Sequence, residues 1–304
     1  MGRHQLSEQT ATPEQDGAPP ARKTREVVSL RGRPGGFSTA SGRLTLGARI
    51  KRVWQYRRIL NLLVRRDLKV RYAGSALGYL WSVLDPLLMS LVFWFIFTQI
   101  FHRHVGYPPY ILFLVMGQMI MTWFQSGVTG TAKALRSEAQ MVRSSSVPRE
   151  LWVVRVAMSK GVEYVYSLPV VLMFALAYRK PPNWHIVFLP VAMLLCFFMV
   201  LSIGLILAPL TVLIRDIDRI IPIVLRFLFY CSPVLWSIKD VPPSLRGIAY
   251  YNPLAGFLTL SRSAFFPQEL VWKPVVISFF SIFILFNIGI WVFTRFESQM
   301  LKEI

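Results

Sequence analysis

The pair Asp216 and Asp218 is the first candidate for chemistry in this sequence. An Asp-x-Asp pair at a membrane surface can hold a divalent cation against the diphosphate of a sugar nucleotide, because hard cations prefer oxygen ligands. Arg215 and Arg219 flank the pair, however, and no second acidic cluster accompanies it. Two interpretations stay open: a membrane-embedded glycosyl or phosphoglycosyl transferase, and, favoured by the flanking arginines, a charged inner loop that contacts a partner.

Other residues with catalytic or ligating potential are sparse. His102 and His104 form an H-x-H, which lacks the further ligands that a metal site needs. Cys196 and Cys231 lie far apart in apolar runs and are expected to be buried, without a disulfide or a metal. The sequence contains no G-x-x-x-x-G-K-[ST], G-x-S-x-G or H-E-x-x-H motif. We therefore expect no catalytic residue, metal or cofactor in this chain.

The composition is that of a membrane protein. The 304 residues are 54% hydrophobic and only 16% charged, with a net charge of +19. Soluble domains carry about 25% charged residues, so this chain has too few charges for a water-facing surface. A soluble enzyme and a nucleic-acid binder are both disfavoured, and several apolar runs exceed the roughly 18 residues of a membrane-spanning helix.

An all-α membrane protein with six transmembrane helices is predicted. The spans are expected at about 77–101, 110–128, 151–178, 186–214, 220–236 and 274–294. The apolar stretch Ile248–Leu260 is too short to cross and is interrupted by Asn252, Pro253 and Gly256. It predicts re-entrant outer helices between the fifth and sixth spans.

Two segments precede the first span. Residues 1–42 are rich in Pro, Gly and Ser and lack an apolar run, which predicts a disordered cytoplasmic tail before a membrane domain at 43–304. Residues 47–69 alternate basic residues with an apolar stripe that includes Trp54, Leu60 and Val64, which is typical of an amphipathic interface helix. Segments on the predicted inner side carry eighteen basic residues against seven on the outer side, which predicts that both termini lie in the cytoplasm. The excess of positive charge favours anionic lipid, not nucleic acid, as a partner.

Few charges lie inside the predicted spans. They are Asp85, Arg155, Lys160, Glu163 and Arg226. Lys160 and Glu163 are three residues apart and could pair along one helix face. The spans hold no series of acidic residues suited to a proton relay, which weighs against a secondary flippase driven by an ion gradient.

Several ordered blocks resemble one transporter family. The run LVRRDLKVRYAGSALGYLWSVLDP at 63–86 is similar to the start of the membrane subunit of type-2 ABC exporters for polysaccharides. VPRE at 147–150, the Arg215-Asp216 pair, SPV at 232–234 and YNPL at 251–254 agree with later blocks of that family. The resemblance covers about Arg57 to Ile304, and the family moves O-antigen, teichoic acid, galactan and related lipid-linked glycans.

The resemblance implies a permease of the bacterial plasma (inner) membrane. Such a permease is a homodimer that pairs with two copies of a separate ATP-binding subunit, where ATP and Mg²⁺ would bind. The cargo would be a polyprenyl-diphosphate-linked polysaccharide that enters from the cytoplasmic side. A type-2 ABC exporter of small hydrophobic compounds is an alternative with the same spans.

The resemblance also implies roles for two groups of residues on the transport path. The lipid diphosphate would meet basic residues and glycines that lead into the first span, namely Arg65, Arg66, Lys69, Arg71, Gly74, Ser75 and Gly78. The glycan would pass a channel lined mainly by aromatics, namely Tyr79, Trp81, Trp94, Arg226, Tyr230 and Trp236.

Two further groups would couple and close the transporter. The resemblance implies a coupling helix for the ATPase within 131–150. The segment suits one, because Ala134 and Leu135 are good helix formers and Pro148 would end the helix. The expected contacts with the ATPase are Ala134, Leu135, Arg136, Arg143, Arg149, Glu150, Arg215 and Asp216. The expected outer gate consists of Ser232, Pro233, Tyr251, Asn252 and Pro253.

Overall fold

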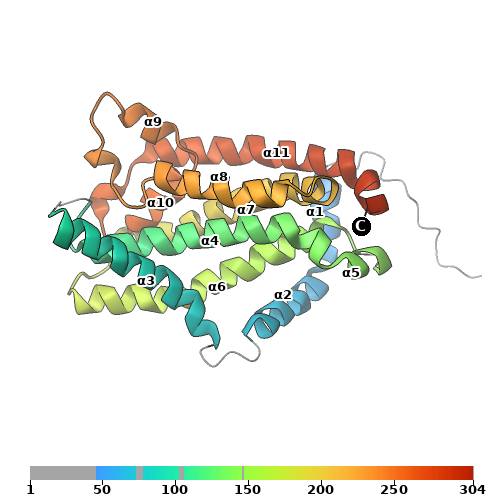
Figure 1. The fold of residues 1–304 in the computed structure, drawn as a ribbon, viewed down its shortest axis with the longest axis horizontal. Helices are drawn as coiled ribbons and strands as arrows, with labels where there is room; N and C mark the ends of the chain where they lie inside the picture. The colour runs from blue at the N-terminus through green and yellow to red at the C-terminus, as the bar shows by residue number, and fades with distance from the viewer. Residues whose placement is uncertain (1–45, 73–77, 103–105, 146, 304) are drawn as a thin grey trace, which may run out of the picture. The chain divides into compact units, whose positions relative to one another are not determined.

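The computed structural model describes residues 46–72, 78–102, 106–145 and 147–303. The described residues are helical with no strand, so the predicted fold class is confirmed. Residues 43–304 form one compact unit (Figure 1). The tail predicted at 1–42 lies outside the described residues.

Five segments are long and apolar enough to span a membrane. They are α3 (Trp81–Phe95) with the π-helical turn Ile96–Ile100, α4 (Tyr110–Ser137), α6 (Glu150–Ala177), the 3₁₀ turn Trp184–Phe188 with α7 (Leu189–Leu213), and α11 (Trp272–Glu303). Each begins within a few residues of a span expected from hydropathy, because long uncharged runs satisfy their backbone hydrogen bonds in lipid only as helices.

Helix α4 is the centre of the bundle. It packs against α3, α6, α7, α8 and α10, and α7 in turn packs along α11. Close approach of α4 and α7 depends on small residues. A Cβ on Gly127 would lie 2.8 Å from Val200, and one on Gly204 would lie 2.6 Å from Thr131, as expected where packing rather than hydrophobic burial joins helices.

The predicted fifth span is shorter than expected. Helix α8 (Ile217–Cys231) has 15 residues, which corresponds to roughly 22 Å of rise against a hydrocarbon core of about 30 Å. One face, including Leu225 and Phe229, is buried, whereas Ile223 and Phe227 on the other face are exposed. That α8 crosses the membrane, which would bring the number of spans to six, therefore stays a prediction.

Short helices occupy the stretch between α8 and α11. They are the 3₁₀ turn Ile238–Asp240, α9 (Arg246–Tyr251), α10 (Ala255–Arg262) and the 3₁₀ turn Pro267–Glu269. All eight residues of α10 are buried, and this helix packs against α4, α7 and α11. That these helices re-enter the membrane stays a prediction.

The expected N-terminal interface helix consists of two helices. Helix α1 (Leu46–Gln55) and α2 (Arg57–Tyr72) meet at a turn at Tyr56. The apolar stripe of α2 is not free, because Leu60, Val64 and Leu68 are buried against Leu151 at the start of α6. The short helix α5 (Ala139–Ser144) follows α4 at the same end of the bundle.

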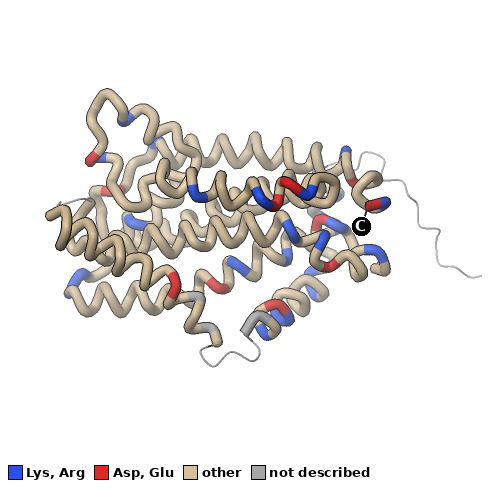
Figure 2. Tube along the Cα trace, in the orientation of Figure 1, with Lys and Arg blue, Asp and Glu red and all other residues tan. Residues whose placement is uncertain are grey.

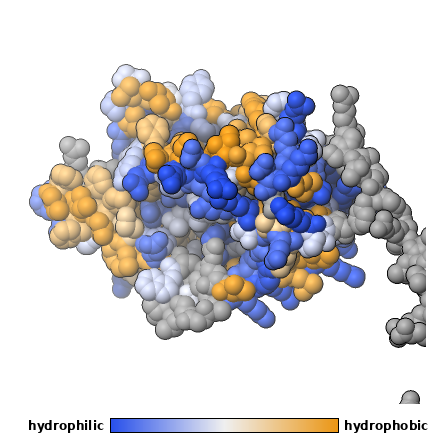
Figure 3. Space-filling view, turned by 45° about the vertical axis from the view of Figure 1, so that its right-hand side comes forward, coloured by the Kyte–Doolittle hydropathy of each residue, from blue (hydrophilic) through white to orange (hydrophobic). Residues whose placement is uncertain are grey.

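Charged residues gather at one end of the bundle. Figure 2 shows Lys, Arg, Asp and Glu concentrated where α1, α2, α5 and the C-terminal part of α11 lie. When that end is turned toward the viewer, hydrophilic residues occupy the centre and right of the surface and hydrophobic residues cover the left (Figure 3). The bundle thus has one charged end; that this end faces the cytoplasm stays a prediction.

Candidate functional site

A stripe of uncharged polar residues runs along one face of α4. Its members follow helical spacing and are Gln118, Thr122, Gln125, Ser126 and Thr129. Polar side chains on a buried membrane helix are costly unless they meet protein partners or a water-filled space. The stripe therefore indicates a polar path along the centre of the bundle.

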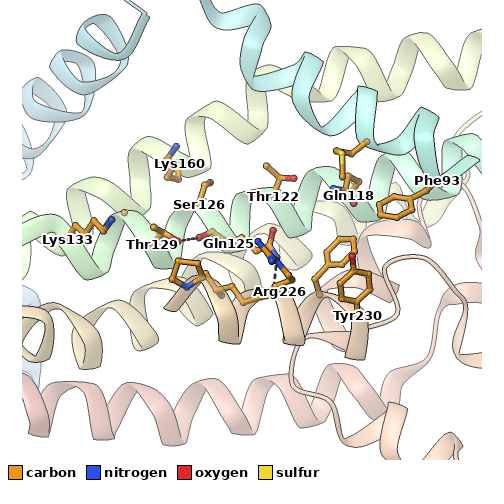
Figure 4. Close-up of a pocket in the computed structure, with 15 residues that line it drawn as sticks. Phe93, Gln118, Thr122, Gln125, Ser126, Thr129, Lys133, Lys160, Arg226 and Tyr230 are labelled. Atoms are coloured by element: carbon orange, nitrogen blue, oxygen red, sulfur yellow. Dashed lines mark hydrogen bonds between the residues drawn. The ribbon is translucent and has the colours of Figure 1, made fainter. Parts of the chain in front are cut away.

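The stripe opens onto a cavity of about 620 Å³. Figure 4 shows its side chains together with those from α3, α6 and α8 that line the same cavity. Phe93 of α3 and Arg226 and Tyr230 of α8 line the opposite walls, and Lys133 and Lys160 lie toward the charged end. Amides, hydroxyls, aromatic faces and cations thus surround one space.

Hydrogen bonds fix part of this lining and leave part available. Gln125 Nε2 donates to the carbonyl of Leu225 at 3.1 Å, and Thr129 Oγ1 donates to the carbonyl of Gln125 at 2.9 Å. Gln118 Oε1 is buried without a hydrogen-bond partner among the described atoms. A buried amide oxygen of this kind can accept a hydrogen bond from a hydroxylated ligand at little desolvation cost.

A second cavity of about 570 Å³ adjoins the first toward the charged end. The two share Gly130, Lys133 and Lys160, and we call them together the α4 groove. Lys160 Nζ lies 2.8 Å from Glu163 Oε2, so the pair predicted from their spacing is confirmed. The half of the groove nearer the charged end thus carries both cations and carboxylates.

An ion-pair network borders the second cavity. Arg155 Nε lies 3.0 Å from Asp67 Oδ2, and Arg155 Nη1 lies 3.2 Å from Glu138 Oε1. Arg66 also pairs with Glu138, and Ser159 Oγ lies 3.4 Å from Asp67. The network joins α2, the α4–α5 junction and α6, so movement of one of these elements must strain the other two.

The residues expected at the lipid diphosphate occupy different environments. Arg66 belongs to the ion-pair network, whereas Arg65 and Lys69 are exposed. Gly78 adopts a φ of +48°, which favours glycine, where the chain enters α3. Gly74, Ser75 and the side chain of Arg71 lie outside the described residues.

The residues expected to line the channel are only partly brought together. Arg226 and Tyr230 line the α4 groove. Trp94 and Trp236 pack, partly buried, against the hydrophobic core, and Trp81 is exposed. The side chain of Tyr79 lies outside the described residues. The α4 stripe was missed because its residues are uncharged, although their spacing is visible in the sequence.

The range 131–150, which is expected to hold the coupling helix, contains the end of α4 and the short helix α5. Helix α4 continues to Ser137, so Ala134 and Leu135 are buried in a second core with Phe293 and cannot contact a partner in this conformation. The exposed segment is α5, which presents Met141 and Arg143 and buries Val142. The α5 helix therefore replaces Ala134 and Leu135 as the candidate contact.

Three of the six other residues in the expected coupling group form ion pairs at the charged end. Arg136 pairs with Asp218 at 2.8 Å, Arg149 pairs with Glu297 at 3.0 Å, and Glu150 pairs with Arg49. Arg215 and Asp216 are exposed. Asp218 thus meets a cation on α4, and no group of three or more His, Cys, Asp or Glu among the described residues could hold a metal.

The expected outer-gate residues are neighbours. Asn252 Nδ2 donates to Ser232 Oγ and to the carbonyl of Cys231, both at 3.0 Å, and Asn252 Oδ1 accepts from the amide of Leu254 at 2.9 Å. The carbonyl of Pro253 accepts from Ser278 Oγ at 2.6 Å. These bonds tie the end of α8 to the start of α10 and to α11, whereas Tyr251 is exposed.

Arg262 organises the interior of this outer region. Its side chain is fully buried and donates to the carbonyls of Phe113, Pro233 and Val234. Its guanidinium carbon lies 3.6 Å from the centre of the Phe113 ring. Burial lowers the pKa of Arg262 to about 10, and burial raises the pKa of nearby Glu269, which accepts a hydrogen bond from Ser237.

A family model matches most of the residues that form this arrangement. The model of the ABC-2 type transporter family matches residues 59–266. The chain belongs to the ABC-2 type transporter family. The match includes the whole α4 groove and the outer-gate residues.

Relatives of this chain are named for O-antigen export or polysialic acid transport. The chain is 29% identical over 243 residues to the O-antigen export system permease protein RfbA of Klebsiella pneumoniae, covering 79% of this chain and 92% of the relative. It is 31% identical over 223 residues to RfbA of Myxococcus xanthus, covering 73% and 85%. It is 24% identical to the polysialic acid transport protein KpsM of Escherichia coli, covering 79% and 94%.

Proposed function

We propose that this chain is the permease subunit of an ATP-driven exporter that moves a polyprenyl-diphosphate-linked polysaccharide from the cytoplasmic side across the bacterial inner membrane. The names of the relatives support this class of cargo. The observation that carries the proposal is the α4 groove, which places amides, hydroxyls and aromatic rings along one continuous polar face.

The chemistry of the groove suits a glycan. Sugar hydroxyls require donors and acceptors when water is removed, and Gln118, Gln125 and Thr129 offer them. Sugar C–H faces are apolar, and Phe93 and Tyr230 offer flat apolar surfaces. Lys133 lies at the charged end of the groove, where the diphosphate of the lipid anchor would approach.

The proposed assembly is a homodimer with two ATP-binding subunits. The chain lacks a P-loop, so ATP and Mg²⁺ would bind in the partner. Helices α3 and α8 both border the groove and expose apolar side chains, including Leu88 and Phe227. A second copy packed on these faces would enclose the groove, and α5 would contact the ATP-binding subunit.

The experiment that tests the proposal is obstruction of the groove. Ser126→Trp places an indole in the cavity, whereas Leu172→Trp adds the same side chain on an exposed position of α6. We expect Ser126→Trp to reduce export of the lipid-linked polysaccharide at least tenfold, with normal membrane insertion and normal recovery of the ATP-binding subunit. Equal export by the two variants would exclude the groove as the path.

The remaining alternatives predict other outcomes. An exporter of small hydrophobic compounds would tolerate loss of the polar stripe, so Gln125→Leu together with Thr129→Val would leave its transport unchanged. For a polysaccharide exporter, the same pair of substitutions removes hydrogen-bonding groups from the path and lowers export.

A further inference from the structure

A separate apolar pocket of about 570 Å³ lies beneath the N-terminal helices. Its walls come from α7 and α11, and its roof comes from α1 and α2. The main wall residues are Phe197, Leu201, Leu205, Phe286, Ile290 and Phe293. We call this space the α1 pocket. It shares no lining residue with the α4 groove, so the proposed transport path does not account for it.

The depth of the α1 pocket corresponds to one leaflet. Its α7 residues lie between Phe197 and Leu205, around the middle of Leu189–Leu213, and its α11 residues lie between Phe286 and Phe293, around the middle of Trp272–Glu303. From there the pocket reaches toward the C-terminal ends of these two helices. On α6 the lining residues Val154 and Met158 lie close to the helix start. All three helices have these ends at the charged side of the bundle (Figure 2). The pocket therefore opens in the cytoplasmic half of the membrane.

The rim of the pocket is basic. Arg49, Arg57 and Glu150 are its charged lining residues. Arg49 is almost buried and pairs with Glu150, so these two charges compensate each other. Arg57 is exposed, and its guanidinium carbon lies 5.5 Å from the centre of the Trp54 ring. No described carboxylate lies within ion-pair distance of Arg57, which leaves one positive charge beside an apolar space.

A basic rim above an apolar wall is complementary to an amphiphile with an anionic head. We infer that the α1 pocket binds an anionic glycerophospholipid of the cytoplasmic leaflet, with an acyl chain against α7 and α11 and its phosphate at Arg57. The volume falls within the range of about 300–1,000 Å³ that is usual for ligand pockets. Trp54, which is 67% exposed, lies where an indole ring favours the interface between head groups and chains.

Bound lipid would complete the contact between the N-terminal helices and the bundle. Helix α1 has little direct packing, since its Val53 is only partly buried, whereas α2 is held by its apolar stripe on α6. An acyl chain in the pocket would contact Val53 and Leu60 from below and Phe286 and Ile290 from the side. The lipid would thereby act as a structural ligand of the cytoplasmic end.

Native mass spectrometry of the complete transporter tests the inference. The complex of this chain with its ATP-binding subunit is exchanged into detergent and incubated with phosphatidylglycerol or with phosphatidylcholine of the same chains. We expect one tightly retained phosphatidylglycerol per copy of this chain. Arg57→Gln should weaken its retention about fivefold, the effect of one cation near an anionic head group. Arg58→Gln, an exposed neighbour outside the pocket, should retain it.

A second pair of variants tests the apolar wall. Leu201→Phe adds volume inside the pocket and should abolish the retained lipid, whereas Leu194→Phe, on an exposed position of the same helix, should not. Equal retention of phosphatidylcholine, or equal losses in Arg57→Gln and Arg58→Gln, would overturn the inference in favour of unspecific boundary lipid. Retention of a polyprenyl phosphate in place of phosphatidylglycerol would also overturn it, because the pocket would then belong to the cargo.

Discussion

Replacement of Arg262 should strongly destabilise the outer region, because this guanidinium group is fully buried among backbone carbonyls. Arg262→Met keeps much of the side-chain volume and removes the guanidinium group. Three buried carbonyls, those of Phe113, Pro233 and Val234, then lose their donor. Each unsatisfied buried acceptor costs about 1–3 kcal/mol, for a gross loss of about 3–9 kcal/mol.

The net loss is smaller because the native state must bury a charge. Desolvation of the guanidinium lowers the pKa of Arg262 to about 10, and removing that charge recovers part of the cost. We expect a net destabilisation of about 3 kcal/mol, at the lower end of what breaking a buried charged network costs. At about 2–4 °C per kcal/mol, the midpoint of thermal unfolding should fall by about 6–12 °C.

The assay is fluorescence-detected thermal unfolding of the detergent-purified chain, with Arg219→Met as the control for loss of an exposed arginine. Arg262→Lys should lie between wild type and Arg262→Met, because one ammonium cannot replace the planar group at all three carbonyls. Gly117→Ala should mimic part of the loss, since its Cβ would overlap Nη2 of Arg262. An unchanged unfolding temperature in Arg262→Met would refute the assigned role.

Three further predictions concern charged groups. Burial raises the pKa of Glu269, so its carboxyl group binds a proton more tightly in the folded than in the unfolded state. The resulting stabilisation is fully present below the unfolded pKa and is lost as pH rises through the raised pKa of the folded state. Glu269→Gln should reduce this pH dependence of the thermal unfolding temperature. The double variant Asp216→Asn and Asp218→Asn should retain export, weakened by loss of the Arg136–Asp218 pair, whereas complete loss of a sugar-transfer activity in the same variant would favour a transferase. Arg155→Met removes the cation that links α6 to Asp67 and Glu138 and leaves these carboxylates with Arg66 of α2. It should lower transport per ATP hydrolysed by at least a few-fold in reconstituted vesicles, and unchanged coupling would show that the network is only structural.

Hydropathy predicts the main helices well because membrane spans depend on local composition. The mainly apolar runs that begin near Tyr110, Leu151 and Ile186 all correspond to helices. The predicted ends are less accurate. The second span was expected to end at Val128, yet α4 continues to Ser137, because the residues at 132–136 are all good helix formers.

Long-range contacts explain most of what the sequence could not predict. Arg262 donates to the backbone carbonyls of Phe113 and Pro233, which are distant in sequence. Because every residue has a backbone carbonyl, the side chains at these positions do not indicate that an arginine binds there. Arg66 looked free to bind a phosphate, but α2 places it against Glu138. The Lys160–Glu163 pair was predictable, because both residues lie on one helix face three positions apart.

The polar stripe on α4 is a different case. The spacing of Gln118, Gln125 and Thr129 is visible in the sequence, and attention to charged residues alone concealed it. The role of the stripe depends on the helices around α4, because a polar stripe can pack against another polar helix or line a cavity. Only the positions of Phe93 and Arg226 across the space distinguish these two possibilities.

The most direct test of the proposed function is gentle purification of the full chain from its native membranes, followed by identification of what co-purifies. The account predicts a near-stoichiometric second subunit that carries the G-x-x-x-x-G-K-[ST] motif, together with ATP-dependent movement of a lipid-linked polysaccharide after reconstitution of the pair. A chain that purifies alone and transfers sugar, or moves its cargo with an ion gradient and no ATP-binding subunit, would contradict it.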